Sequence, residues 1–250
     1  MAHCEYLDYT FEVGSCDMDV WGTLKPTSIL HICQEVAYMH STKLGFGFER
    51  LQETNTAWVL SRIKVEIDHL PVWHDKITVR TWHKRQSGLF SLRDYIFYDE
   101  LQQPIIKVTS SWLTINIATR RITRIDRIFN SDDTFNISQY PHDAIAIEAE
   151  RIEMPQQKVA ARDHLVAYSD LDVNNHVNNA RYMEWACDNS PQQMDNNSHL
   201  SSFILNFNHE ATYGELVTLS TAQLNPNSIH VEGSVSGKGI FTALLNYCDA

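Results

Sequence analysis

The 250-residue sequence lacks the features of membrane and secreted proteins. It contains no run of about 18 apolar residues, the length that a membrane-spanning helix requires. Its first residues form neither a basic segment nor an apolar one, unlike a secretory signal. The five cysteines are odd in number and form no C-x-x-C pair, which argues against a disulfide framework and a thiolate metal site. We therefore expect a cytoplasmic protein that spans no membrane.

The short motifs of several enzyme classes are also missing. There is no G-x-S-x-G, no phosphate-binding loop and no G-x-G-x-x-G. The twelve histidines include no H-E-x-x-H and no Cys/His cluster. The sequence predicts no metal site and no cofactor.

Basic residues are outnumbered by acidic ones, 20 to 31, which gives a net charge of −11. This excess argues against nucleic acid as a partner, because binding to phosphates requires a basic surface. Residues 1–130 are balanced, with 15 basic and 15 acidic side chains, so the whole excess lies in residues 131–250. An acidic partner would be repelled by one part of the chain and tolerated by the other, although a solvated acidic face explains the asymmetry equally well.

Two stretches of the sequence recur in the same order. The segment Cys16–Val20 resembles Ser169–Val173, with Asp19 opposite Asp172. Further along, Leu60–Leu70 resembles Leu200–Glu210. Chance similarity between short segments is the alternative explanation, but collinear matches favour an internal duplication.

Each copy predicts a helix followed by strands. The first helix begins near Pro26 and carries on one face Ile29, Cys33, Val36, Ala37 and His40; the second carries Tyr182, Trp185, Ala186 and Asn189. Alternating apolar residues predict antiparallel strands at Lys76–His83, Leu89–Tyr98, Ile105–Ile117, Leu216–Leu224, Ser228–Val235 and Ile240–Tyr247.

The predicted fold class is α+β, with two helix-wrapped antiparallel sheets joined edge to edge as a pseudo-dimer. We assign residues 1–130 to an N-terminal half and residues 163–250 to a C-terminal half. Residues 131–162 form a polar linker between them.

The two copies differ at chemically important positions. Where the first has Trp21-Gly22-Thr23, the second has Asn174-Asn175-His176, and Leu70 is replaced by Glu210. Residues that the two copies share are expected to serve the fold, whereas polar residues found in only one copy indicate a catalytic role. Titratable side chains are therefore concentrated in the second half.

These residues suit attack on a carbonyl group. A loop that enters a helix offers backbone N–H groups and a positive dipole end, which stabilise an oxyanion in a dry site. The imidazole of His176 can orient or deprotonate water, while Asp172 or Glu210 can hold the imidazole or act as the base.

Structural roles compete with the catalytic ones. Asn178 and Asn179 suit helix capping better than catalysis. Asp172 has a counterpart in the first copy, so a turn role and a catalytic role are both open. Glu210 is out of phase with the buried face of the preceding strand unless a bulge intervenes.

The segment Ser169–Tyr182, with its D-x-N-x-H-V-N-N pattern, closely resembles the active-site segment of acyl-ACP thioesterases from plant plastids and bacteria. The resemblance extends to Leu60-Ser61-Arg62, Pro71-x-Trp73-x-Asp75 and Thr119-Arg120-Arg121, and covers roughly residues 5–128 and 160–248.

The resemblance implies a tandem (double) hotdog fold and hydrolysis of the thioester between a fatty acyl chain and acyl carrier protein (ACP). It implies that the catalytic residues are Asp172, Asn174, His176 and Glu210. Many family members have a cysteine after the glutamate, where this sequence has Ala211, which excludes a cysteine nucleophile there. The plant transit peptide is not found, which favours a bacterial type of protein in the cytosol.

Our mechanistic hypothesis is that Glu210, assisted by His176, activates water while Asn174 and helix N–H groups hold the thioester oxygen. Asp172 would position Asn174 or His176. An acyl-enzyme route through a carboxylate is an open alternative.

In the family, the first half is associated with the acyl chain, so we name Trp58, Val59 and Trp112 as substrate-contacting candidates, with core packing as the competing role. For docking of ACP, which is acidic in the family, the candidates are Arg62 and Lys64, together with Arg80, Lys84 and Arg85. A merely solvated face is the alternative.

Two other functions stay open at this point. One is an acyl-CoA thioesterase of the same fold, and the other is a non-catalytic acyl-binding or dehydratase-like hotdog. The sequence leaves open whether two copies associate as a homodimer.

Overall fold

The computed structural model describes residues 5–124, 140, 142–153, 155–194 and 198–249. One antiparallel sheet of ten strands forms its frame, in the order β1-β3-β4-β5-β2-β7-β10-β9-β8-β6. The first five positions come from the first half: β1 (Leu7–Glu12), β2 (Thr56–Ile67), β3 (Lys76–Ser87), β4 (Phe90–Tyr98) and β5 (Pro104–Asn116). The others are β6 (Val159–Leu165), β7 (Ser198–Phe207), β8 (Leu216–Asn225), β9 (Ser228–Val235) and β10 (Lys238–Asp249).

The strand order repeats around the junction between β2 and β7. Each half has the same internal order when read outward from this junction, so β2 corresponds to β7 and β5 to β10. The junction itself is an antiparallel pairing in which Arg62 lies opposite Asn206 and Glu66 opposite Ser202. The prediction of two α+β halves joined edge to edge is therefore confirmed.

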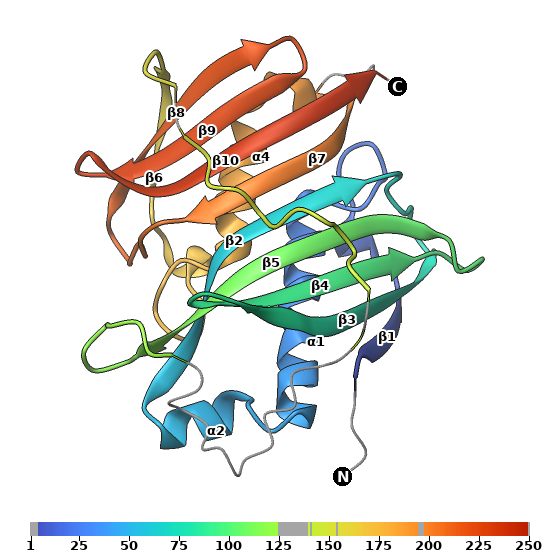
Figure 1. Ribbon diagram of the computed structural model, residues 1–250. Coiled ribbons are helices and arrows are strands. Elements are labelled where there is room, and N and C mark those ends of the chain that lie inside the picture. The colour runs from blue at the N-terminus through green and yellow to red at the C-terminus, as the bar shows by residue number, and fades with distance from the viewer. Residues whose placement is uncertain (1–4, 125–139, 141, 154, 195–197, 250) are drawn as a thin grey trace.

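The helices lie behind the sheet in Figure 1, where α1 (Pro26–Lys43) and α4 (Asn179–Asp188) pack against each other. Pro26 occupies the first helical turn of α1, and the five residues predicted for its inner face are all buried. In α4, Tyr182, Trp185 and Ala186 are buried as predicted, whereas Asn189 is the C-cap. A shorter helix α2 (Phe48–Glu53) precedes β2, and 3-10 turns lie at Ser15–Asp17, Tyr168–Asp170 and Pro191–Met194.

One continuous apolar core joins the halves. It contains Val36 of α1, Met183 of α4 and Ile63, Phe203 and Phe241 from the central strands. Among the described residues, no helix is long and apolar enough to cross a membrane.

Part of the chain between the halves, residues 142–153, crosses the sheet face opposite the helices in Figure 1. We call residues 142–152 the strap. It is fixed by Trp82, whose indole N–H donates to the His142 carbonyl at 3.0 Å, and by Asn206. The Asn206 amide accepts from Ile152 N at 2.7 Å and donates to the Glu150 carbonyl at 2.9 Å. The proposed boundary at residue 130 lies outside the described residues, and the proposed boundary at residue 162 falls within β6.

A buried polar cluster lies where the end of α1 meets β3 and β4. The Arg93 guanidinium is 2.9 Å from Nδ1 of His40 and donates to the Thr81 hydroxyl at 3.2 Å. Next to it, Nε2 of His83 lies 2.5 Å from the Ser91 hydroxyl. Burial, with the nearby charge of Arg93 and the nearby His40, lowers the pKa of His83 to about 3.

This pKa predicts acid sensitivity. Below pH 6.5 the unfolded chain protonates His83 while the folded protein does not, so stability present above that pH is lost as pH falls toward 3. Between pH 7 and pH 5 we expect the wild type to lose about 2 kcal/mol more than a His83→Gln variant. Urea unfolding of both proteins at the two pH values measures this, and equal losses would contradict the assignment.

Candidate active site

The predicted catalytic loop forms a tight turn around Asp172. Its Oδ1 accepts hydrogen bonds from the backbone N–H of Asn174 at 2.8 Å and of His176 at 3.4 Å. Asn175 adopts a left-handed conformation with φ of 60°, which asparagine tolerates better than most residues. Asp172 thus has the turn role that the sequence left open, and its Oδ2 also lies 3.4 Å from the Asn174 side-chain amide nitrogen.

The loop leads directly into α4. Asn178 is the N-cap, and its side chain accepts from the backbone N–H of Ala180 at 2.9 Å. The capping role predicted for Asn178 is therefore confirmed. The turn places Asn174 and His176 within four residues of the positive end of the helix dipole.

Glu210 lies beyond the end of β7. The backbone N–H groups of Asn208 and His209 both donate to the Ile240 carbonyl, at 2.8 and 3.1 Å, so the strand alternation ends before Glu210. This irregularity resolves the phase problem seen in the sequence. Next to it, the buried Ala211 carbonyl accepts from Val177 N at 2.9 Å and joins this segment to the catalytic loop.

His176 and Glu210 face each other in the structure. Nε2 of His176 lies 3.4 Å from Oε2 of Glu210, and their side chains are 28% and 34% exposed. An imidazole beside a carboxylate is an arrangement that can accept a proton from water, and partial exposure leaves it open to a substrate. The structure therefore brings together three predicted residues around one turn, with Glu210 against His176.

Arg120 of the first half also contacts this site. Its guanidinium pairs with the same Oε2 of Glu210 that faces His176. Arg120 lies in the hairpin that follows β5, about 90 residues earlier in the sequence. The sequence indicates no role for Arg120, because its only signal is membership of the Thr119-Arg120-Arg121 motif.

The first half contains an equivalent loop with matching backbone hydrogen bonds but different side chains. Leu24 N donates to the Pro71 carbonyl at 2.9 Å, as Val177 N does to Ala211, so Leu70 corresponds to Glu210. Asp19 Oδ1 accepts from Trp21 N and Thr23 N, at 2.9 and 3.0 Å, as Asp172 does in the second half.

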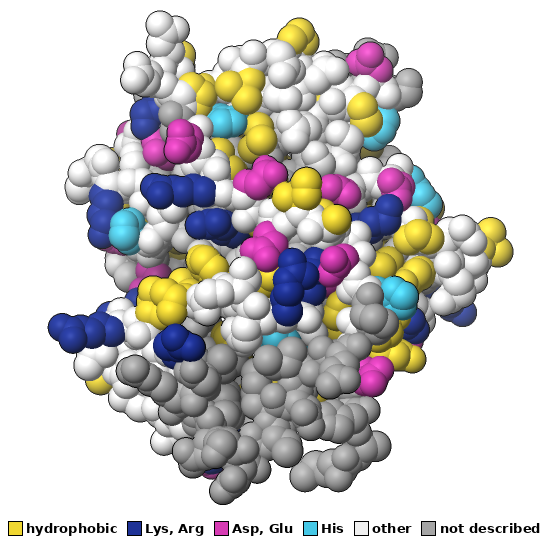
Figure 2. Space-filling view, in the orientation of Figure 1, with side chains coloured by type: hydrophobic (Ala, Val, Ile, Leu, Met, Phe, Trp, Pro, Cys, Tyr) yellow, Lys and Arg dark blue, Asp and Glu magenta, His cyan; other side chains and the backbone are white. Residues whose placement is uncertain are grey.

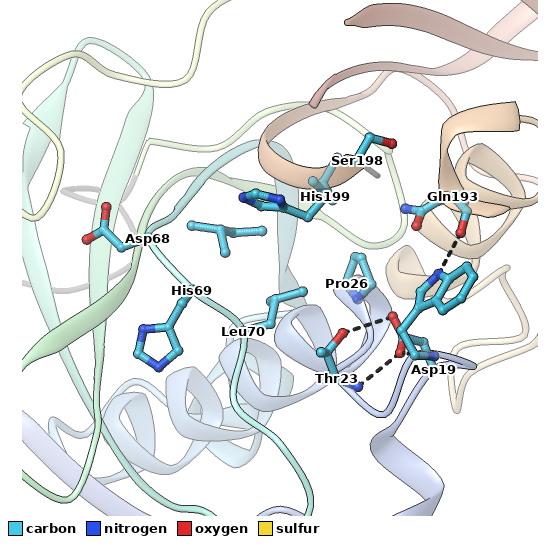
Figure 3. Close-up of a pocket in the computed structure, with 12 residues that line it drawn as sticks. Asp19, Thr23, Pro26, Asp68, His69, Leu70, Gln193, Ser198 and His199 are labelled. Atoms are coloured by element: carbon cyan, nitrogen blue, oxygen red, sulfur yellow. Dashed lines mark hydrogen bonds between the residues drawn. The ribbon is translucent and has the colours of Figure 1, made fainter. Parts of the chain in front are cut away.

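A pocket of about 430 Å³ lies at this equivalent loop. Asp19, Thr23, Pro26 and Leu70 are among the residues that line it (Figure 3). The Trp21 indole donates to the Gln193 carbonyl at 3.0 Å, across the two halves. The residues that correspond to His176 and Glu210 are Thr23 and Leu70, which cannot form a carboxylate–imidazole pair. The His–Glu pair thus forms at one of the two equivalent loops, although Asp68, His69 and His199 also line the pocket of Figure 3.

The predicted substrate contacts lie on β2 and β5. Trp58 and Val59 are half-buried near the start of β2, and Trp58 Nε1 donates to the Phe46 carbonyl at 3.5 Å. In the second half, the residues that correspond to Trp58 and Val59 are Ser198 and His199, which line the pocket of Figure 3. From this correspondence we expect Trp58 and Val59 to lie near the loop of residues 172–177, and they and Trp112 stay predictions as substrate contacts. The Trp112 indole donates to the Ser110 hydroxyl at 2.9 Å.

The predicted docking residues are largely engaged within the molecule. Arg62 stacks over Phe90 at 5.4 Å, and Lys64 lies 3.5 Å from Glu66. Figure 2 shows basic and acidic side chains intermingled over this face. Lys84 is wrong as a docking residue, because its side chain is 2% exposed and pairs with the buried Asp94.

Arg80 and Arg85 each pair with acidic neighbours. Arg80 Nη2 lies 2.7 Å from Oδ2 of Asp8, and Arg85 pairs with Asp143 and Glu148 at 3.4 and 3.2 Å. Among the described residues, no group of three or more His, Cys, Asp or Glu side chains could hold a metal ion.

Comparison with known proteins identifies the family. The N-terminal domain of acyl-ACP thioesterases matches residues 5–131, and the C-terminal domain matches residues 153–240. The chain belongs to the acyl-ACP thioesterase family. A curated relative, oleoyl-acyl carrier protein thioesterase 2 of Arabidopsis thaliana, is 27% identical over 236 residues, which are 88% of this chain and 63% of that protein. The chain thus spans less than two thirds of this plant relative.

Solved structures of the family share the double hotdog fold. An acyl-ACP thioesterase from Bacteroides thetaiotaomicron is 25% identical with a TM-score of 0.81, over 98% of both chains. The 12:0-ACP thioesterase from Umbellularia californica is 20% identical with a TM-score of 0.80, over 100% of both chains, and supports the fold alone. The tandem hotdog implied by the sequence resemblance is therefore confirmed.

Proposed function

We propose that this protein hydrolyses the thioester between a fatty acyl group and the phosphopantetheine arm of ACP and releases a free fatty acid. The observation that carries the proposal is the His176–Glu210 pair beside Asn174, formed at only one of the two equivalent loops. Family membership and the names of the relatives support acyl-ACP as the substrate class.

The residues suggest how the reaction proceeds. A water oxygen attacks the thioester carbonyl carbon while the His176–Glu210 pair takes up its proton. The carbonyl oxygen becomes an oxyanion, and the Asn174 amide, oriented by Asp172, donates a hydrogen bond to it. When the tetrahedral intermediate collapses, the C–S bond breaks and the departing thiolate takes the proton.

A covalent route through the Glu210 carboxylate remains the competing mechanism. It would form a mixed anhydride, which water then hydrolyses. Single-turnover hydrolysis in ¹⁸O-labelled water distinguishes the two routes, because hydrolysis of the anhydride at the Glu210 carboxyl carbon places ¹⁸O in Glu210 and none in the first fatty acid released. Water attack labels that fatty acid directly.

The test of function is release of free thiol from acyl-ACP and acyl-CoA substrates of graded chain length. We expect hydrolysis of acyl-ACP with a higher kcat/KM than of the matching acyl-CoA. A preference for acyl-CoA would favour the alternative thioesterase, and binding without turnover would favour the non-catalytic protein. The named relatives act on oleoyl and 12:0 chains, so the panel must span both lengths.

Two further proposals concern the setting of the enzyme. We propose a cytoplasmic location, tested by cell fractionation, and association of two copies as a homodimer, tested by sedimentation equilibrium. Neither is needed for the catalytic proposal, because both halves of the site belong to one chain.

A further inference from the structure

The catalytic carboxylate is shared between two partners from different halves of the molecule. Oε2 of Glu210 lies 3.4 Å from Nε2 of His176 in the second half. The same oxygen pairs with the Arg120 guanidinium from the first half. The site is therefore incomplete in either half by itself.

The hairpin that carries Arg120 is fixed by several backbone hydrogen bonds. Asn116 N donates to the Arg121 carbonyl at 2.8 Å, and Arg120 N donates to the Asn116 carbonyl at 2.8 Å. The Asn116 side-chain oxygen accepts from Thr119 N at 2.9 Å. Arg120 itself has a φ of 57°, a conformation that the closed turn imposes on it.

The hairpin is also attached to the start of β2. Ile117 N donates to the Asn55 carbonyl at 2.9 Å, next to the residues that begin this strand. The guanidinium is thus presented to Glu210 by a braced turn rather than by a free loop. This bracing makes a positioning role physically reasonable for a side chain that is 51% exposed.

We propose that Arg120 is a positioning residue that keeps Glu210 ionised and aimed at His176, so that the imidazole rather than the carboxylate takes the proton from water. This inference rests on the proposed function. A guanidinium next to a carboxylate favours its charged form and makes it a poor proton acceptor. An ionised carboxylate beside an imidazole in turn stabilises the imidazolium that forms when water is deprotonated.

The path of the proton follows from the arrangement of His176, Glu210 and Arg120. With the ring proton of neutral His176 on Nε2, the nitrogen that lies 3.4 Å from Oε2 of Glu210, the lone pair is on Nδ1, which accepts the proton as the water oxygen bonds to the carbonyl carbon. The imidazolium then returns that proton to the sulfur as the C–S bond breaks. Glu210 stays a carboxylate throughout, paired with Arg120.

Two other roles would fit an exposed arginine, and kinetics separates them from positioning. An ordinary surface ion pair would contribute little to stability or rate. A guanidinium that binds the acidic carrier would change KM and leave kcat unaltered. A positioning residue changes kcat and the pH dependence of kcat/KM.

The experiment compares Arg120→Gln with Arg121→Gln, the adjacent arginine of the same hairpin, on an acyl-ACP substrate. We expect Arg120→Gln to lower kcat about 10- to 100-fold with KM within about twofold of the wild type. The acidic limb of its pH profile moves to higher pH, because loss of the cation makes protonation of the His176–Glu210 pair easier. Arg120→Lys retains the positive charge but lacks the two-pronged guanidinium, so its kcat should lie between those of the wild type and Arg120→Gln.

A control must show that other charged groups near the His176–Glu210 pair do not produce the acidic limb of the pH profile. His209 adjoins Glu210, and burial together with Lys238 of β10 lowers the pKa of His209. A His209→Asn variant should keep the wild-type acidic limb, which assigns that limb to the His176–Glu210 pair. If His209→Asn removes the limb, the proposed origin of the pH shift is wrong.

Three results would overturn the role of Arg120. They are equal kcat values and pH profiles for the two arginine variants, a raised KM with unchanged kcat, and a loss of kcat that follows a lower melting temperature without a pH shift. Failure of the wild type to hydrolyse any acyl thioester would instead refute the proposed function.

Discussion

Replacing His176 with Ala is expected to lower kcat for acyl-ACP hydrolysis by about 10²- to 10⁴-fold, the usual contribution of a general acid–base residue. The imidazole is the group that faces Glu210 across 3.4 Å, and its removal leaves the carboxylate without its partner. Steady-state thiol release measures the loss. The matched control is Thr23→Ala at the equivalent position in the first half, which should retain the wild-type rate.

A Glu210→Gln variant should lose activity to a comparable degree. Because the two side chains act as a unit, the double variant His176→Ala/Glu210→Gln should be little slower than the more damaging single variant. Far-UV circular dichroism and thermal unfolding check that the fold persists. Wild-type rates in folded forms of either single variant would remove these residues from the mechanism.

The largest effect on stability is expected from Asp94→Ala, at about 3–5 kcal/mol. The Asp94 carboxylate lies 3.1 Å from the Lys84 ammonium, and their side chains are 0% and 2% exposed. Removal of Asp94 leaves Lys84 buried beside a single, partly exposed carboxylate. It also removes the acceptor for Ala144 N, at 2.8 Å, which fixes the strap to β4. Urea unfolding monitored by tryptophan fluorescence gives the free energy.

Asp143 provides the control for this prediction. It lies 3.0 Å from the same Lys84 ammonium, but its side chain is 48% exposed. Asp143→Ala should therefore cost less than about 1 kcal/mol. Similar losses for the two variants would mean that burial does not govern this cluster.

Much of the fold could be predicted because its signals are local. The Asp19 and Asp172 turns, the inner face of α1 and the cap at Asn178 each depend on residues a few positions apart. The comparison of the two copies added what a single copy lacks, because it identified Glu210 by its replacement with Leu70. That inference required only an alignment of the two copies. The equivalent hydrogen bonds accepted by the Pro71 and Ala211 carbonyls support this alignment.

The features that escaped prediction depend on contacts between distant segments. Arg120 meets Glu210 only because the ten-stranded sheet places β5 and β7 on either side of β2, with the ends of both strands at the same edge. Lys84 is a docking candidate from sequence because it lies in the charge-balanced first half, but in the structure it is buried and donates to the Ile145 carbonyl of the strap. Residues 142–152 lack the periodicity of a strand or helix, so nothing in their sequence indicated that they would cover a sheet.

The junction between β2 and β7 has a consequence for synthesis on the ribosome. Arg62 and Asn206 are neighbours in the sheet, yet about 140 residues of chain separate them. Until the later segment emerges, β2 is a bare strand edge, the kind of surface on which nascent chains aggregate. Its side chains at every second position, Arg62, Lys64 and Glu66, are charged, and charge on an unpaired edge discourages association with other chains. These residues would then act as gatekeepers during translation before they become part of the finished sheet.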